Sequence, residues 1–222
     1  RIGINRVSLG VQDFDERVQH AIGRLQSYEM TQKAVEQFRD KGIGSINIDL
    51  VYGLPHQTED SVARTIEQVL SLDPDRIAIF GYAHLPSRLK HQRLIDEKVL
   101  PDAMQRFQQS RRVAAMLAQA GFISIGIDHF ARQSDNLARE PLARNFQGYT
   151  TDAASALIGF GASAISRLPQ GFAQNDVAVD GYARRLSLYG LATARGAILT
   201  EDDRVRSHVI ERLMCAFSLS ES

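Results

Sequence analysis

Hydrophobic and polar positions along the chain change their spacing in a regular way. Four short apolar runs rich in β-branched residues predict strands at residues 6–12, 45–51, 76–80 and 122–127. Between them, apolar residues recur every three to four positions, which is typical of helices with one buried face. Thr58 and Asp102 stand where the N-caps of two such helices are expected. This alternation predicts βα units and a parallel sheet.

The predicted strands are apolar on only one side. At residues 45–51, Ile46, Ile48 and Leu50 share a face opposite Asn47 and Asp49. The runs at 6–12 and 122–127 repeat this parity, with aliphatic residues at 7, 9 and 11 and at 123, 125 and 127. A sheet covered by helices on both faces should be apolar on both, whereas a barrel that holds a ligand has polar residues inside. The pattern therefore favours part of a βα barrel over a flat, doubly wound sheet.

The character of the chain changes after Arg132. Residues 133–141 are polar and loop-like, and from about Asp176 the apolar spacing predicts helices. We expect a first domain over residues 1–132 and a second region over residues 133–222. The chain starts without Met and ends within an amphipathic pattern, so we expect a piece of a longer protein.

The amino-acid composition argues against several classes of function. The 222 residues contain 26 Lys and Arg and 26 Asp and Glu, which gives a formal net charge of zero. This balance argues against a dedicated nucleic-acid binder and a polybasic membrane anchor. No apolar run is long enough to predict a membrane span, and Cys215, the single cysteine, excludes a disulfide framework or a Cys-rich metal site. A cytoplasmic protein is the expectation.

Polar residues at the ends of the predicted strands are the first candidates for a site. Asp49 ends its strand, and a carboxylate there could bind hydroxyl or amine groups of a ligand, or could simply accept hydrogen bonds from nearby backbone. Gln12 occupies the same place on the preceding strand, while Asp13 is a candidate cap of the next helix. Arg24 follows a short helical segment and could hold a carboxylate, although a solvated arginine is commoner there.

Other candidates are less specific. His84 and His129 follow strands and could bind metal or move protons, but no third ligand is evident. Residues 144–149 form a polar and aromatic run that is a candidate lid or binding segment. Cys215 lies in an apolar helical pattern, where we expect a buried small hydrophobe. From the residues alone, the reaction stays open.

Six segments in order, at residues 6–14, 47–55, 82–86, 128–132, 144–151 and 163–166, resemble the oxygen-independent coproporphyrinogen III oxidase family of radical S-adenosylmethionine (SAM) enzymes. The resemblance implies an α/β fold, with the second half of a partial βα radical SAM barrel followed by the start of a mostly helical C-terminal domain. It also implies a [4Fe–4S] cluster and two SAM molecules per full-length protein. A 5′-deoxyadenosyl radical then takes hydrogen from propionate groups of coproporphyrinogen III, and decarboxylation gives the two vinyl groups of protoporphyrinogen IX.

The resemblance also implies site residues. By motif position, Gln12, Arg24, Asp49 and Ala83 would contact the second SAM, and Ile165 would contact the first. No catalytic residue and no metal ligand is assigned, because the family's Cys-x3-Cys-x2-Cys cluster motif is absent. The cluster ligands are therefore expected outside this chain, and this chain alone is expected to be inactive.

The implied partners are coproporphyrinogen III and an unidentified electron donor and acceptor. From the charge balance no nucleic-acid or membrane partner is expected, and a monomer is the preferred oligomeric state. Arg132 and Arg144 are candidates for contacts with the tetrapyrrole carboxylates. A related haem-binding chaperone without turnover is the alternative. Arg24 and the run at 129–132 favour the enzyme.

Overall fold

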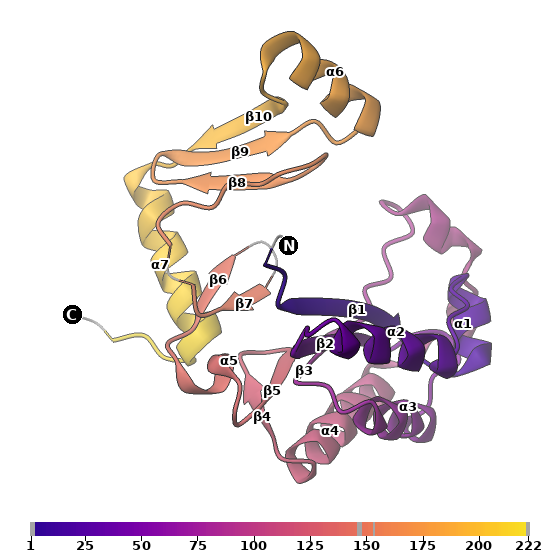
Figure 1. Cartoon of the computed structure of the whole chain (residues 1–222). Helices are drawn as coiled ribbons and strands as arrows, with labels where there is room; N and C mark the ends of the chain where they lie inside the picture. The colour runs from indigo at the N-terminus through magenta and orange to yellow at the C-terminus, as the bar shows by residue number, and fades with distance from the viewer. Residues whose placement is uncertain (1–2, 146–147, 153, 221–222) are drawn as a thin grey trace. The chain divides into compact units, whose positions relative to one another are not determined.

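The computed structural model describes residues 3–145, 148–152 and 154–220 (Figure 1). The chain divides into two compact units, Arg1–Arg139 and Glu140–Ser222. Among the described residues, no helix combines the length and the apolar character needed to cross a lipid bilayer.

The first unit alternates strands and helices, as the spacing of apolar residues predicts. Its elements are β1 (Arg6–Gln12), α1 (Glu16–Ile22), α2 (Tyr28–Asp40), β2 (Ser45–Tyr52), α3 (Glu59–Ser71), β3 (Arg76–Gly81), the 3-10 helices η1 (Lys90–Leu94) and η2 (Glu97–Val99), α4 (Ala103–Gln119), β4 (Phe122–Ile125), β5 (His129–Arg132) and α5 (Asn136–Arg139). The strand order in the sheet is β1-β2-β3-β5-β4. Strands β1, β2 and β3 are parallel, and β5 runs antiparallel to both β3 and β4.

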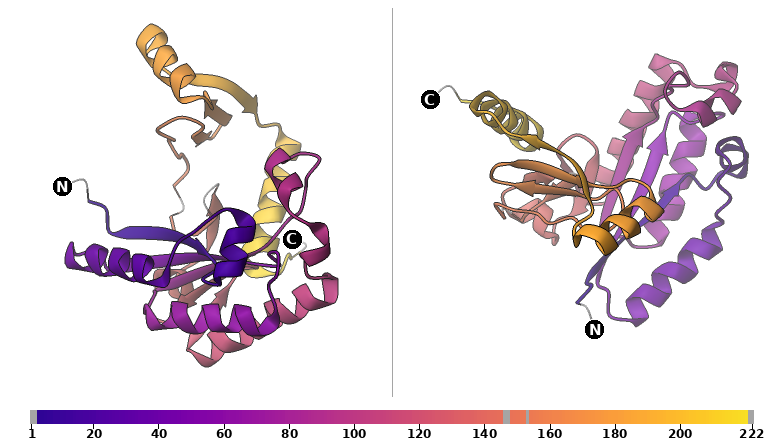
Figure 2. Two further views of the ribbon diagram at one scale, coloured as in Figure 1. Left: turned by 90° about the vertical axis from the view of Figure 1, so that its right-hand side faces the viewer. Right: turned by 90° about the horizontal axis from the view of Figure 1, so that it is seen from above.

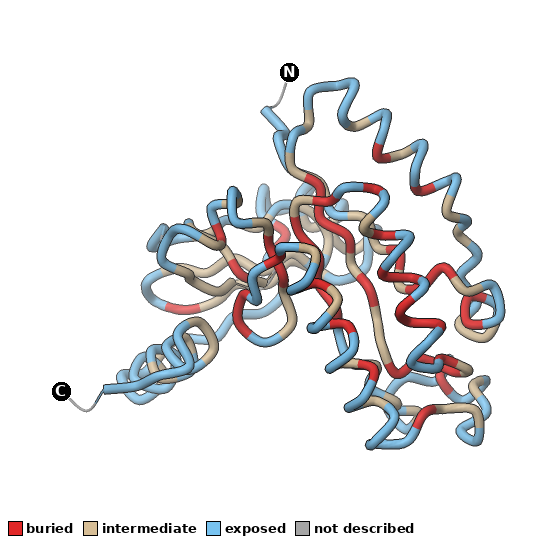
Figure 3. Tube along the Cα trace, turned by 90° about the horizontal axis from the view of Figure 1, so that it is seen from below, coloured by how far each residue is buried: buried red, intermediate tan, exposed pale blue. Residues whose placement is uncertain are grey.

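The aliphatic face of the parallel strands is covered by helices. Ile46, Ile48 and Leu50 of β2 are buried, and they belong to one core cluster with apolar residues of α3 and α4. Figure 2 shows α3 and α4 side by side on one side of the strands, and Figure 3 shows the buried positions concentrated along the strands and these helices. The expected caps are confirmed. The Thr58 and Asp102 side chains accept hydrogen bonds from the backbone of Ser61 and Gln105.

The fourth predicted strand differs from the expectation in length and in the parity of its residues. Strand β4 ends at Ile125, and Gly126 adopts a positive φ of 58°, a conformation that favours glycine. The chain then returns as β5, which lies between β3 and β4. The predicted aliphatic face of residues 123, 125 and 127 is therefore wrong. Phe122 and Ile125 are buried, whereas Ile123 and Ile127 are 39% and 60% exposed.

The second unit contains more strand than the sequence indicated. Its described elements are β6 (Ala143–Asn145), β7 (Gly148–Thr150), β8 (Ile165–Leu168), β9 (Gly171–Asn175), α6 (Val179–Tyr189), β10 (Thr193–Ile198) and α7 (Glu201–Ala216). Strands β6 and β7 form an antiparallel pair, and β10, β9 and β8 form an antiparallel sheet in that order. Cys215 is half-buried in α7.

The expectation of a mostly helical region from about Asp176 is corrected by β10, a strand between α6 and α7. All six residues of β10 are exposed. A strand without a buried face needs no alternation of apolar and polar residues, so the sequence carries no period-two signal there.

Candidate functional site

The polar face of the parallel strands carries the first group of candidate residues. Gly10 of β1 lies opposite Asp49 of β2 in the register of the sheet. Nδ2 of Asn47 donates hydrogen bonds to Oδ1 of Asp49 at 2.6 Å and to Oγ of Ser8 at 3.2 Å. Asn47 is buried, and within the part of the chain that the structure describes its Oδ1 has no hydrogen-bond partner. The face therefore presents an anchored carboxylate and a buried acceptor oxygen.

The electrostatic setting of Asp49 suits a carboxylate that receives a ligand. Burial raises the pKa of Asp49, while the hydrogen bond from Asn47 and the charge of His129 act in the opposite direction. His129 lies on the same face, because it pairs with Ala78, which in turn pairs with Asp49. Nδ1 of His129 is 2.6 Å from Oδ1 of Asp128. A donor group of a ligand would relieve the burial cost of the ionised Asp49.

Gln12 and Arg24 converge on the same end of β1. The register shifts between Gly10 and Gln12, and Gln12 has a left-handed φ of 71°. Helix α1 ends at Gly23, whose positive φ turns the chain, and Nη2 of Arg24 then donates a hydrogen bond to the Gly10 carbonyl oxygen. A Cβ atom at Gly10 would lie 3.0 Å from Nε2 of Gln12 and 3.5 Å from Nη2 of Arg24. These two side chains thus border Gly10, the residue paired with Asp49.

The other two predicted contacts lie elsewhere. Ala83 follows β3, whose last residue, Gly81, pairs with Tyr52 at the carboxyl end of β2. The Ala83 carbonyl accepts a hydrogen bond from Nε2 of Gln92 at 3.0 Å. Ile165 opens β8 in the second unit. The first unit therefore brings Gln12, Arg24 and Asp49 together and places Ala83 beyond the same strand ends, whereas Ile165 belongs to the other unit.

Each candidate histidine has a carboxylate partner of its own. Nε2 of His84 lies 3.2 Å from Oε1 of Glu97, and Nδ1 of His84 lies 3.1 Å from the Tyr82 hydroxyl. His129 pairs with Asp128 as described above. The described residues include no group of three or more His, Cys, Asp or Glu side chains placed to hold a metal ion.

Asp13 has a different role from the one expected. The N-cap of α1 is Asp15, so the assignment of Asp13 as a cap is wrong. Asp13 is fully buried, and its carboxylate accepts hydrogen bonds from the Asp15 backbone N–H at 2.7 Å, the Thr65 hydroxyl at 2.7 Å and Nε2 of Gln57. Asp13 thus joins the turn after β1 to α3. Two of its partners, Gln57 and Thr65, are distant in sequence, so no local pattern indicates this role.

Of the two arginines considered for tetrapyrrole carboxylates, Arg132 is already engaged. It donates to the Pro74 carbonyl at 3.1 Å, pairs with Asp73, and places its guanidinium carbon 4.7 Å from the centre of the Phe122 ring. Asp73 and Pro74 precede β3, beyond the amino-terminal end of that strand. The contact of Arg132 with a tetrapyrrole carboxylate stays a prediction. Arg144 lies in β6, and positions 146–147 of the predicted binding run lie outside the described residues.

The residues of the first unit fit SAM but the chain does not fit an iron–sulfur cluster. An anchored carboxylate, a guanidinium and an amide match the amino, carboxylate and hydroxyl groups of that cofactor. Within the described residues, the buried Oδ1 of Asn47 has no hydrogen-bond partner, which is consistent with a ligand at this face. A cubane needs several thiolates close together, and this chain has one cysteine.

The first parallel βα units of the chain, with their polar strand ends, lie in a segment that matches a known family. Residues 1–69 match the family described as the Radical SAM superfamily. A solved structure described as coproporphyrinogen III oxidase (HemN) from Escherichia coli, a radical SAM enzyme, superposes with a TM-score of 0.91 at 43% identity, covering 98% of this chain and 51% of that chain. This likeness confirms the expected partial βα fold.

Curated relatives agree with the structural match. The chain is 52% identical over 220 residues to the oxygen-independent coproporphyrinogen III oxidase of Bradyrhizobium diazoefficiens, covering 97% of this chain and 49% of the relative. It is 47% identical over 223 residues to the enzyme of the same name from Pseudomonas aeruginosa, covering 99% of this chain and 48% of the relative. The predicted resemblance is therefore confirmed: over nearly its whole length the chain is similar to oxygen-independent coproporphyrinogen III oxidases. It spans about half the length of the curated relatives that it matches.

Proposed function

We propose that this chain supplies SAM-binding and substrate-binding parts of an oxygen-independent coproporphyrinogen III oxidase. That enzyme converts two propionates of coproporphyrinogen III to the vinyl groups of protoporphyrinogen IX. The observation that carries the proposal is the convergence of Gln12, Arg24 and Asp49 around Gly10. The family motifs imply contacts with the second SAM at these three positions.

The proposed roles follow from the chemistry of each group. The Asp49 carboxylate accepts hydrogen bonds from hydroxyl or amino groups of the second SAM, and Arg24 and Gln12 bind its polar atoms at the end of β1. Ala83 contacts the same molecule through its backbone and methyl group, and Ile165 contacts the first SAM through apolar packing. When bound, SAM and a [4Fe–4S] cluster supply the radical that removes hydrogen from the substrate. The residues of this chain bind and orient SAM and the substrate, and they keep water away from the reacting groups.

The cluster ligands are proposed to lie outside this chain, because it contains a single cysteine. We therefore expect no turnover by the 222 residues alone. We further propose that the protein is a cytoplasmic monomer. It receives electrons from one partner and delivers them to another.

Anaerobic turnover tests the proposal. The protein that carries this chain is reconstituted with iron and sulfide, and its products from coproporphyrinogen III are followed by mass spectrometry. The account predicts loss of two carboxyl groups per substrate, a large loss of rate in Asp49→Asn, and an unchanged rate in Asp40→Asn, which alters an exposed carboxylate at the end of α2. Stable haem binding with no decarboxylation would instead support a haem chaperone.

A further inference from the structure

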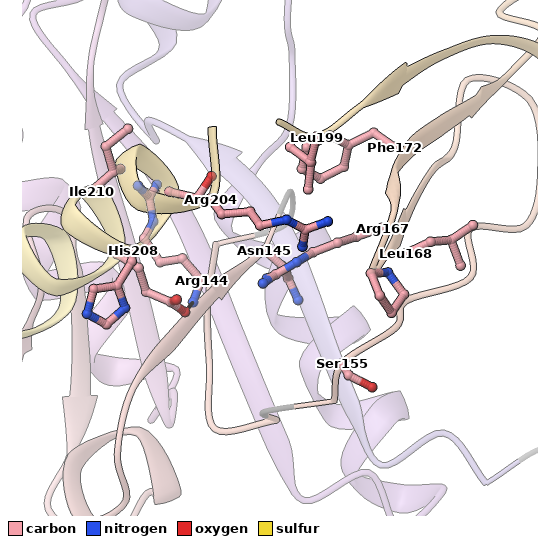
Figure 4. A pocket seen from close by; sticks show the side chains of 13 residues that line it. Arg144, Asn145, Ser155, Arg167, Leu168, Phe172, Leu199, Arg204, His208 and Ile210 are labelled. Carbon is pink, nitrogen blue, oxygen red and sulfur yellow. Dashed lines mark hydrogen bonds between the residues drawn. The ribbon is translucent and has the colours of Figure 1, made fainter. Parts of the chain in front are cut away.

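A cavity of about 480 Å³ lies within the second unit, and positive charge dominates its lining (Figure 4). Its wall includes Arg144 of β6, Arg167 of β8, and Arg204 and His208 of α7. Glu211 is the acidic residue of the lining. The side chains of Arg167 and Arg204 extend from β8 and α7 toward the same space in Figure 4.

The local structure explains why these side chains line the same cavity. Arg204, His208 and Glu211 are four and seven residues apart along α7, a spacing that places them on one face of a helix. Oε1 of Glu211 accepts a weak hydrogen bond from the Arg144 backbone N–H at 3.4 Å, so this carboxylate contacts the main chain of β6. Arg167 projects from the middle of β8 between two antiparallel neighbours, Leu157 and Phe172.

The guanidinium groups are incompletely neutralised. Within the described part of the chain, Arg167 has no hydrogen-bond or ion-pair partner for its side chain, and the buried Nε of Arg144 has no hydrogen-bond partner. Among the described residues, Arg204 forms an ion pair with Glu201 alone, and the Glu201 side chain is 94% exposed, so water screens that pair. Arginines held near one another repel unless an anion joins them, and a guanidinium binds a carboxylate through paired hydrogen bonds.

The rest of the lining is apolar. Leu168, Phe172, Leu199 and Ile210 contribute to the wall beside the charged groups. Pockets of this volume, with apolar walls and a few fixed polar groups, are typical of small-molecule sites. The lining thus matches a ligand that combines carboxylates with an apolar body.

We propose that this cavity binds carboxylate side chains of an apolar polycarboxylate, and that under the proposed function the ligand is the propionate-bearing edge of the tetrapyrrole. The identity of the ligand rests on the proposed function, whereas the carboxylate chemistry rests on the cavity alone. Arg167 lies two residues after Ile165 on β8, so both side chains point to the same face of that strand. The strand that carries the residue implied for the first SAM would then also hold the substrate.

Fluorescence titration with coproporphyrin III, the stable oxidised tetracarboxylate, tests the proposal on the 222-residue chain. We expect Arg167→Gln to weaken binding at least tenfold and Arg204→Gln to weaken it severalfold. Arg184→Gln is the matched control, because Arg184 is an exposed arginine of α6 outside the cavity lining, and its affinity should equal that of wild type. The tetramethyl ester of coproporphyrin, which lacks the carboxylates, should bind wild type and Arg167→Gln equally.

The outcomes separate this proposal from the proposed function. Equal coproporphyrin affinity in Arg167→Gln, Arg204→Gln and Arg184→Gln overturns the cavity proposal, and so does an absence of coproporphyrin binding by a chain that binds SAM. Dependence on Arg167 and Arg204, in a chain whose SAM binding is insensitive to Asp49, supports the carboxylate site and contradicts the proposed function. Should Arg167→Gln fail to fold, Arg204→Gln decides alone, because Arg204 lies on the exposed surface of α7.

Discussion

Asn47 holds Asp49 by a hydrogen bond of 2.6 Å between two residues on the polar face of the same strand. The Asn47 side chain is buried. Its amide is a neutral donor, so it holds the carboxylate in place without adding a positive charge. This pair links the sequence pattern of β2 to the proposed ligand site, because the alternation of the strand places both side chains on one face.

Removing the Asn47 amide should change the pH dependence of SAM binding. Burial raises the pKa of Asp49 and the Asn47 hydrogen bond lowers it, so Asn47→Ala should raise this pKa further. Binding that needs the ionised carboxylate weakens as pH falls through the pKa of Asp49. We expect the weakening to begin at higher pH in Asn47→Ala than in wild type.

Calorimetric titration of SAM from about pH 4 to 8 measures this shift. Asn5→Ala, at an exposed position before β1, is the control and should follow the wild-type profile. Identical profiles for Asn47→Ala and Asn5→Ala would show that Asn47 does not act on the binding carboxylate.

A methyl group at Gly10 should leave the fold intact but disturb the proposed SAM site. A Cβ atom there would lie 3.0 Å from Nε2 of Gln12 and 3.5 Å from Nη2 of Arg24, both at the ends of flexible side chains. We therefore expect Gly10→Ala to weaken SAM binding severalfold while thermal unfolding changes little. Gly44→Ala is the control, because a Cβ atom at Gly44 would meet no other atom within 4 Å. Equal SAM affinity in the two variants would place the ligand away from Gly10.

Asp13→Asn should test the buried turn between β1 and α3. Burial raises the pKa of Asp13 above its ordinary value of 3.8, so the folded state holds this proton more tightly than the unfolded state. The Asp13 contribution to stability is therefore fully present below pH 3.8 and is lost as pH rises through the raised pKa of the folded state.

Asp13→Asn should remove that pH dependence. It should also cost about 1–3 kcal/mol at neutral pH, because one amide donor of Asn would face the amide of Gln57. Urea unfolding at several pH values measures both effects. An undiminished fall of stability with rising pH in the variant would assign the effect to another group.

The buried ion pair of Arg76 and Asp135 should contribute much of the stability at the start of β3. Two contacts of 2.7 Å join the guanidinium to the carboxylate, and their side chains are 9% and 8% exposed. Asp135→Ala leaves a buried charge without its partner, so we expect a loss of about 3–5 kcal/mol in chemical denaturation. Asp202→Ala breaks an exposed pair with Arg206 and should cost less than about 1 kcal/mol. Similar costs for the two variants would contradict this assignment.

The sequence was informative where periodicity and local caps determine structure. Strands β1 to β3 and the caps at Thr58 and Asp102 follow from patterns within a few residues. Strand β5 was missed because the chain reverses at Gly126, and β10 was missed because it is wholly exposed. Strands β5 and β10 depend on tertiary pairing rather than on a local pattern.

The candidate site also combines features that a local sequence pattern predicts with features that only the folded chain shows. Strand parity placed Gln12 and Asp49 on one face, but the approach of Arg24 depends on the positive φ of Gly23 and a contact with the backbone of Gly10. Gln57 and Thr65, two partners of Asp13, lie 44 and 52 residues away from it, and the cationic cavity of the second unit combines β6, β8 and α7. These contacts become evident only once the chain is folded.

Equilibrium binding of SAM to this chain and to Asp49→Asn tests the central claim most directly. The account predicts saturable binding by wild type and by Asp40→Asn, with an affinity loss of about 1–3 kcal/mol in Asp49→Asn, the scale of one charged hydrogen bond. Equal affinity in all three proteins, or no binding by any of them, would contradict the assignment of the polar face of β1 and β2 as a SAM site.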